Sequence, residues 1–429
     1  MLLTQTSPVA ATALTRQGAV ANVQTRDFTT FWIITAALVA FVLKLVIASN
    51  TFGTNDVITF YEFARSLHQH GLQWTYQNDI SFNHPPLTAY YLRAIYQLDH
   101  QPAFREFGLS FPLLIRLPGI FADLITCLAV LWVTKKDRRI VIPSWALLLF
   151  ALSPVSLMIS GFHGNTDPVM VMFLVLAALS VLGGVPVLAG VMLALSCQVK
   201  IIPLLFLPIF FFYFNKRGKT AAFVVPFALC SAALWSEPLL HFPRLFAENV
   251  LSYGSFWGIW GISYWLRLTN LPQFGIVTFH HFPPWEALVV TVLKMLVVIA
   301  IVGLAWRRRG LDERGFINSI AYGWIVFFIF SPGVCVQYMI WLAPFVLFLS
   351  ARFYAWLTAT SCLFVFFFYN VTAGGLPWYV AISTNQLNRV WTPWTIWPWV
   401  VLIIGLVCLW RNAVAKTPGL RLLSLRIAA

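Results

Sequence analysis

The chain has 429 residues, of which 60% are hydrophobic and only 10% are charged, and its formal net charge at pH 7 is +14. Soluble domains average about 45–50% apolar and about 25% charged residues, so this composition excludes an ordinary soluble protein. The basic residues lie in short segments between long apolar runs. No contiguous basic face with interleaved aromatic residues results, which argues against nucleic-acid binding.

The apolar runs predict an all-α, polytopic bundle of about twelve helices that cross the ~30 Å hydrocarbon core of a bilayer. The first 27 residues are polar and lack the apolar core and cleavage site of a signal peptide, so the run from Phe28 is predicted to be a retained first span. The stretch 186–214 fits either one long kinked helix or two short ones. The predicted spans are 28–48, 111–134, 140–161, 167–183, 186–199, 200–214, 220–236, 286–306, 316–331, 337–351, 353–371 and 394–411.

Two long loops, 49–112 and 237–285, interrupt this series. In the first, residues 58–67 and 87–98 alternate apolar and polar positions at helical spacing, which predicts helices that lie in the membrane interface. The second carries a cluster of aromatic side chains that suits either an interfacial belt or a groove for a lipid ligand. These side chains are Phe256, Trp257, Trp260, Tyr264 and Trp265.

The distribution of charge predicts the orientation of the chain. Most of its 28 basic residues fall on one side of the membrane if both termini lie on that side. Because short cytoplasmic loops are enriched in Lys and Arg, residues 1–27 and 412–429 are predicted to be cytoplasmic tails. They flank a single transmembrane domain, 28–411, in the cell membrane, with loops 49–112 and 237–285 on the extracytoplasmic side.

Polar residues with candidate roles in chemistry gather on that predicted extracytoplasmic side. Asp56 follows the first span, where it could cap the next helix or act as a general base. His84 precedes two prolines at a predicted helix start. His163 and Asp167 lie in the compact turn 161–168, where the residues before Pro168 also fit an ordinary helix N-cap.

Three cations, Lys44, Arg116 and Lys200, fall in or near predicted spans. A charge in hydrocarbon costs a few kcal/mol and usually has a partner. Lys44 could extend its ammonium to the membrane surface, and Asp123 could be a buried partner for one of the three. Lys200 has no acidic neighbour in the sequence, so a bound phosphate is predicted as its counter-ion.

Segment 337–344 opens the tenth predicted span and completes the candidate site. Gln337 and Tyr338 begin it, and Trp341 shares a helical face with Tyr338. Trp341 is predicted to anchor this helix at the interface. The candidate site residues are therefore Asp56, His84, Arg116, His163, Asp167, Lys200, Gln337 and Tyr338.

On these residues the chain resembles the GT-C superfamily of integral membrane glycosyltransferases, and most closely its mannosyltransferase-like branches that use polyprenyl-phosphate sugars. The resemblance implies inverting transfer of a hexose, mannose or similar, from a polyprenyl-phosphate donor to a lipid, glycan or protein acceptor outside the cytoplasm. It implies that Asp56 deprotonates the acceptor and that Arg116, Lys200 or His163 stabilises the leaving phosphate. The segments that carry it are Asn55-Asp56, Arg116-Leu117-Pro118, the turn 161–168, residues 199–203, and Gln337-Tyr338 with Trp341 and Pro344.

No cofactor is expected. Asn55-Asp56 is not the Asp-x-Asp or paired-acid pattern of some branches, so nothing in the sequence supports a divalent metal, although one stays open as an alternative. The six cysteines show no CxxC spacing and predict no zinc site. A multi-pass transporter or lipid flippase is the alternative function. It should show internal repeats and polar sites near the bilayer midplane, whereas here the polar groups gather at one surface.

Overall fold

The computed structural model describes residues 8–79, 81–137, 139–252, 260–262, 264–265, 284–382, 394 and 396–416. Within these ranges the chain is almost entirely helical. The helices of the first half are α1 (Pro8–Asn50), α2 (Asn55–Asn78), α3 (Pro86–Asp99), α4 (Pro102–Glu106), α5 (Phe111–Leu114), α6 (Leu117–Lys136), α7 (Ser144–Ala151), α8 (Pro154–Met158), η1 (Ile159–His163), α9 (Asp167–Leu182), α10 (Pro186–Val199), η2 (Ile202–Phe206) and α11 (Leu207–Asn215). They are followed by α12 (Thr220–Leu234), α13 (Ser236–His241), α14 (Pro243–Phe246), η3 (Ala247–Leu251), α16 (Pro284–Arg308), α17 (Glu313–Phe330), η4 (Val336–Ile340), α18 (Ala343–Leu349), α19 (Ala351–Thr372) and α21 (Trp397–Lys416).

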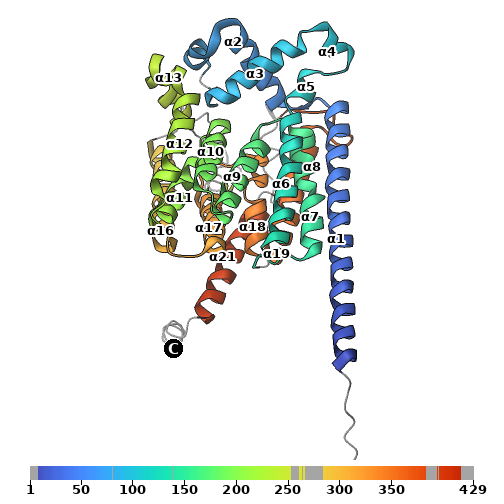
Figure 1. Cartoon of the computed structure of the whole chain (residues 1–429). Coiled ribbons are helices and arrows are strands. Elements are labelled where there is room, and N and C mark those ends of the chain that lie inside the picture. The colour runs from blue at the N-terminus through green and yellow to red at the C-terminus, as the bar shows by residue number, and fades with distance from the viewer. Residues whose placement is uncertain are drawn as a thin grey trace, which may run out of the picture.

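Most of these helices stand roughly side by side in a bundle, with α1 along one edge (Figure 1). Five described helical segments are long and apolar enough to cross a membrane: Phe28–Asn50, Phe111–Lys136, Ser144–His163, Ala287–Arg308 and Ala351–Thr372. Their outer faces expose large apolar side chains, such as Val42 at 54% and Ile299 at 61%, which lipid would cover. The prediction of an all-helical, multi-pass membrane protein is confirmed.

Six further apolar helices among the described residues are shorter, between 10 and 17 residues. Proline residues set several of their boundaries, because proline lacks the backbone N–H that an inner helical position donates. Thus α10 begins at Pro186, and Pro203 and Pro208 lie in the first turns of η2 and α11. The stretch 186–214 therefore forms two short helices rather than one kinked helix. The number of twelve spans stays a prediction.

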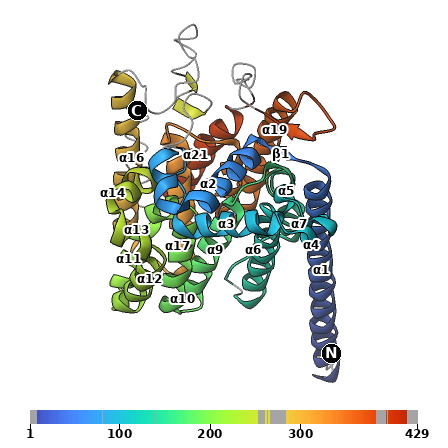
Figure 2. The same ribbon diagram turned by 90° about the horizontal axis from the view of Figure 1, so that it is seen from above.

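The first long loop folds into a helical layer across one end of the bundle (Figures 1 and 2). Helices α2 and α3 form this layer at the positions where the sequence pattern predicts helices, and Gly71 adopts φ 84° at a kink within α2. Apolar side chains between the two helices make a separate core, which includes Phe63, Leu67 and Leu92. This layer, referred to below as the cap, positions the start of α2 over the bundle.

The first part of the second long loop forms α13, α14 and η3. Trp260 is fully buried, and its indole Nε1 donates a hydrogen bond of 2.7 Å to the carbonyl oxygen of Phe328. The prediction that Trp260 belongs to an interfacial belt or a lipid groove is therefore wrong, because its ring fills the bundle core. Phe256 and Trp257 lie outside the described residues.

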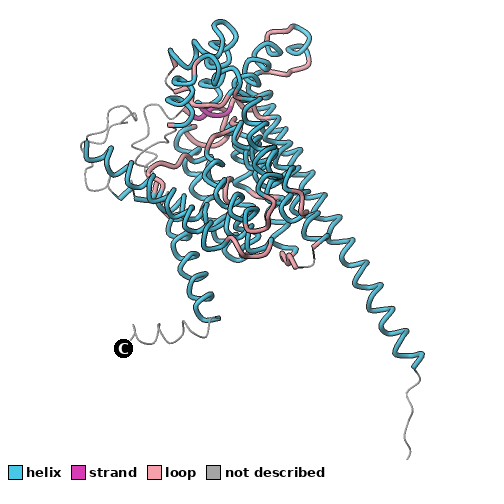
Figure 3. The backbone as a smooth tube through the Cα atoms, turned by 60° about the vertical axis from the view of Figure 1, so that its left-hand side comes forward, coloured by secondary structure: helices cyan, strands magenta, loops and turns pink. Residues whose placement is uncertain are grey.

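A short parallel strand pair joins the cap to a distant part of the chain (Figure 3). Strand β1 (Gly53–Thr54) pairs with β2 (Val380–Ala381), with Gly53 opposite Val380. Gly53 adopts φ +105°, and a Cβ there would lie 2.7 Å from the carbonyl oxygen of Phe162. Only glycine fits this position easily, so the chain can pass close to η1 before α2 begins.

Candidate active site

Asp56 lies in the first turn of α2, and its side chain is 29% exposed. Thr54 is the N-cap of this helix: its hydroxyl accepts a hydrogen bond from the Asp56 backbone N–H at 3.3 Å and donates to the carbonyl oxygen of His163 at 2.7 Å. The capping role that the sequence allows for Asp56 is therefore wrong, because Thr54 fills it. The Asp56 carboxylate is left for other partners.

One carboxylate oxygen of Asp56 is held from two sides. His163 Nε2 lies 2.9 Å from Asp56 Oδ2, and Gln337 Nε2 donates to the same oxygen at 3.4 Å. On the other side of the imidazole ring, the hydroxyl of Tyr369 lies 2.7 Å from His163 Nδ1. The structure thus brings together three predicted site residues from α2, η1 and η4, and adds Tyr369 from α19.

His163 reaches Asp56 because the chain around it takes an unusual path. Residues Ile159–His163 form a π-helical turn, a geometry that is frequent at functional sites. Gly164 follows with φ +85°, and a Cβ at this position would clash with the side chain of Val57. Glycine therefore permits the close approach of η1 and α2 that the His163–Asp56 contact requires.

Lys200 and Asp167 form a buried ion pair beside this cluster. The ammonium of Lys200 lies 2.5 Å from Asp167 Oδ1, and Asp167 has no exposed surface. Asp167, at the start of α9, and not a phosphate, is the counter-ion of Lys200 in the structure. A role for Lys200 in binding the donor phosphate stays a prediction. Asp167 does not cap α9, since Thr166 occupies the N-cap position without a side-chain hydrogen bond.

Two aromatic rings cover Lys200 on another side. Its ammonium lies 4.9 Å from the ring centre of Tyr338 and 5.2 Å from that of Trp341, distances at which cation–π attraction acts. The two rings stack on each other with centroids 3.7 Å apart. Trp341 is fully buried, so the prediction that it anchors the helix at the membrane interface is wrong.

Arg116 is 1% exposed and its guanidinium lies among backbone carbonyl groups. It donates to the carbonyl oxygens of Thr51 and Phe52 at 2.6 and 3.0 Å, and to that of Gly161 at 3.0 Å. These contacts join the end of α1 to η1 and so fix the two segments that carry Asp56 and His163. The N–H groups of Arg116 are therefore used to hold the backbone, which gives this residue a structural role.

His84 is buried between the cap and the bundle. Its ring packs against Phe60 and Phe82, and its backbone carbonyl accepts a hydrogen bond of 2.7 Å from the hydroxyl of Tyr76. Burial, together with the nearby charge of Lys200, lowers the pKa of His84 to about 3. At neutral pH this side chain is uncharged.

Whereas the surroundings of His84 favour its uncharged form, those of Asp56 favour its charged form. Burial acts to raise the pKa of Asp56, but the interaction with His163 and the charge of Lys200 outweigh it, so the pKa lies below its ordinary value. The carboxylate is therefore ionised at neutral pH. An ionised, partly exposed carboxylate is the form that a general base needs.

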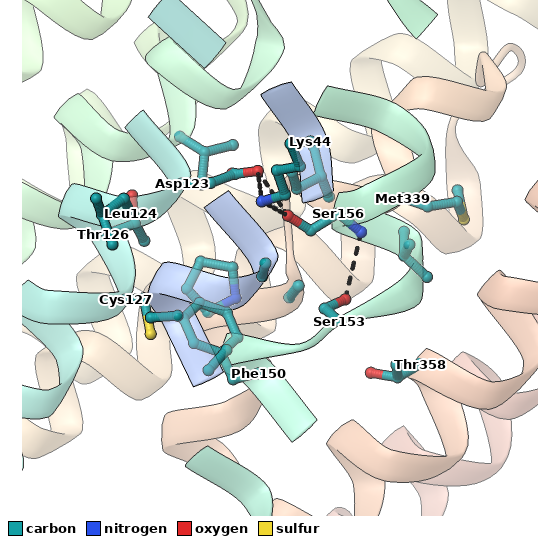
Figure 4. Close-up of a pocket in the computed structure, with 18 of the residues that line it drawn as sticks. Lys44, Asp123, Leu124, Thr126, Cys127, Phe150, Ser153, Ser156, Met339 and Thr358 are labelled. Carbon is teal, nitrogen blue, oxygen red and sulfur yellow. Dashed lines mark hydrogen bonds and ion pairs between the residues drawn. The ribbon is translucent and has the colours of Figure 1, made fainter. Parts of the chain in front are cut away.

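A second polar cluster lies inside the bundle (Figure 4). Lys44 pairs with Asp123 at 2.6 Å, and the hydroxyls of Ser156 and Ser160 each donate to the same carboxylate oxygen at 2.5 Å. Lys44 is 4% exposed, so the prediction that it extends to the membrane surface is wrong, whereas the role predicted for Asp123 is confirmed. A cavity of about 40 Å³ adjoins the pair and is also lined by Tyr354.

A metal ion would need several His, Cys, Asp or Glu side chains close together. Among the described residues, no group of three or more His, Cys, Asp or Glu side chains is placed to hold a metal ion. The expectation of a metal-free site stays a prediction.

The described residues thus form a helical membrane protein with a partly exposed carboxylate at one end of its bundle. The model of glycosyltransferase family 87 matches residues 102–332, which is more than half of the chain. The comparison with curated proteins gave no match. The protein belongs to glycosyltransferase family 87, a GT-C family of membrane glycosyltransferases, and the predicted class of enzyme is confirmed.

Proposed function

We propose that the protein transfers a hexose, mannose or similar, with inversion, from a polyprenyl-phosphate-linked donor to a lipid, glycan or protein acceptor on the extracytoplasmic side of the membrane. The observation that carries this proposal is the Asp56 carboxylate, which is ionised, 29% exposed and held through Oδ2 by His163 and Gln337. Membership in the glycosyltransferase family favours this function over a transporter or flippase.

In the proposed mechanism Asp56 Oδ1 accepts the proton of an acceptor hydroxyl while that oxygen attacks the anomeric carbon of the donor. The bond from this carbon to the phosphate oxygen breaks on the opposite face, through an oxocarbenium-like transition state. The phosphate departs with the bonding electron pair and needs no acid to protonate it. Configuration at the anomeric carbon is therefore inverted in one step.

We assign the donor phosphate to the neighbourhood of Lys200. A cation fixed in place before the reaction stabilises the charge that develops on the leaving group without further reorganisation. Tyr338, under the ammonium, and the uncharged His84 complete this side of the site. We give Arg116 a supporting role instead, because its guanidinium joins the backbone after α1 to that of η1. The polyprenyl chain is proposed to lie between helices or along loop 237–285.

Removal of the Lys200 charge is expected to weaken donor binding by about ten- to a hundredfold, the value of one charge-assisted contact. Lys200→Met alone would leave Asp167 buried and unpaired, so the test variant is Lys200→Met combined with Asp167→Asn. Binding of a polyprenyl-phosphate mannose probe to purified protein in nanodiscs gives the measurement, and Lys200→Arg, which keeps the charge, is the control. Wild-type affinity in the double variant would show that another group binds the phosphate.

The proposed orientation places both termini in the cytoplasm and the cap outside, with twelve spans. Phe107 lies between α4 and α5 in the cap and is 83% exposed, so it is a suitable reporter position. In a cysteine-free background, Phe107→Cys should react with a membrane-impermeant maleimide in intact cells, whereas Arg309→Cys, between α16 and α17, should react only after lysis. Protection of the Phe107→Cys variant in intact cells would reverse the orientation.

A further inference from the structure

Asp56, His163 and Tyr369 form a continuous chain of hydrogen bonds that leads from the partly exposed carboxylate into the bundle. The two contacts measure 2.9 and 2.7 Å. His163 is 3% exposed and Tyr369 is fully buried, so water does not compete for the contact between these two side chains. The three side chains come from α2, η1 and α19, and packing of separate elements fixes their relative positions.

The proton positions in this chain follow from the chemistry of its members. An ionised carboxylate can only accept hydrogen bonds, so His163 Nε2 carries a proton and donates it to Asp56 Oδ2. Within the described part of the chain, the hydroxyl of Tyr369 makes its hydrogen bond to His163 Nδ1 and to no other atom. If Tyr369 donates to Nδ1, both ring nitrogens of His163 and the phenolic proton have hydrogen-bond partners. A charged imidazole would donate from both nitrogens and leave the buried phenolic proton without an acceptor.

We propose that His163 and Tyr369 are positioning residues for the base: Tyr369 fixes the tautomer of His163, and His163 holds Oδ2 of Asp56 so that Oδ1 is presented to the acceptor hydroxyl. This inference rests on the proposed function and changes the part that His163 plays in it. With both ring nitrogens occupied, His163 offers no donor to the leaving phosphate. That task stays with Lys200.

The charges around Asp56 determine how removal of the His163 side chain should change the pH dependence of activity. Lys200 faces the cluster from the end of α10 and its partner Asp167 from the start of α9. The uncharged His84 faces it from the cap, and Gln337 donates from η4. Without the N–H of His163, the remaining neighbours stabilise the carboxylate less, and the pKa of Asp56 rises. The base works only when it is ionised. On acidification, the variant should therefore lose activity at a higher pH than the wild-type protein does.

The experiment is the pH dependence of kcat/KM for transfer from polyprenyl-phosphate mannose to a membrane lipid extract, with protein in nanodiscs. His163→Leu should move the acid limb up by about one to two pH units, since one contact to a charged group is lost. His163→Gln places an amide N–H near the same oxygen and should restore most of the wild-type profile. Tyr369→Phe should lower kcat by about two- to tenfold and leave the KM for the donor unchanged.

The outcomes separate this proposal from the function on which it rests. An acid limb at the wild-type pH in His163→Leu would overturn the role of His163, and unchanged kcat in Tyr369→Phe would overturn that of Tyr369. If His163→Leu does not fold, His163→Gln and Tyr369→Phe still test the proposal. A folded His163→Gln protein that does not restore most of the wild-type activity would contradict it. Asp56→Asn serves as the reference: activity in that variant would remove the proposed function itself.

Discussion

Asp56→Asn is expected to reduce turnover by about 10²–10⁴-fold, the usual cost of removing a general base, while the protein stays folded. An amide matches the carboxylate in shape and can still accept the hydrogen bond from His163, but it cannot take a proton from an acceptor hydroxyl. The start of α2 should not change, because its N-cap is Thr54. Single-turnover transfer of radiolabelled mannose from a polyprenyl-phosphate donor measures the effect.

A matched control exists on the same helix. Glu62 is half exposed and pairs with Arg65 on the surface of α2, so Glu62→Gln should leave turnover and thermal stability near the wild-type values. Donor binding should persist in Asp56→Asn, since the base contacts the acceptor rather than the phosphate. A stable Asp56→Asn protein that transfers sugar at the wild-type rate would remove Asp56 from the mechanism.

The second large effect concerns stability. Lys44→Met or Asp123→Leu alone should each destabilise the protein by roughly 3–5 kcal/mol, because each leaves its partner as an uncompensated buried charge. The side chains of this pair are only 5% and 14% exposed. The double variant removes both charges and should recover most of the loss. Unfolding midpoints in detergent at fixed pH provide the comparison.

The control for this pair is again Arg65 with Glu62, whose side chains are 50% and 45% exposed. Exposed ion pairs contribute about 0–1 kcal/mol, so Arg65→Met should hardly move the midpoint. If the Lys44→Met and Asp123→Leu double variant were as unstable as either single variant, the cost would lie in packing around the cavity and not in the unpaired charge.

The helical membrane architecture could be predicted from the sequence because it depends on local properties. Runs of apolar residues mark the helices, and the prolines at 186, 203 and 208 mark several starts. The helical spacing of residues 58–67 and 87–98 placed α2 and α3 correctly. Asp56, His163 and Gln337 could be selected as polar residues on one side of the predicted spans, and the structure shows them in contact.

The partners of these residues could not be predicted, since each partnership depends on tertiary packing. Tyr369 follows three phenylalanines within an apolar run, so nothing local distinguishes it from a core residue. Lys200 and Asp167 were both candidates, but their pairing depends on how α9 and α10 pack. The buried position of Trp341 likewise depends on the stacking with Tyr338 that the fold creates.

The strand pair has a consequence for how the enzyme is made. β1 ends two residues before Asp56, yet its partner β2 and the buried Tyr369 come roughly 300 residues later in the chain. At a synthesis rate of about 5–20 residues per second, Asp56 leaves the ribosome about 15 to 60 seconds before the segment that completes its surroundings. The surroundings of the proposed catalytic carboxylate are therefore complete only when α19 has been inserted, and a nascent chain that stops earlier lacks a finished site.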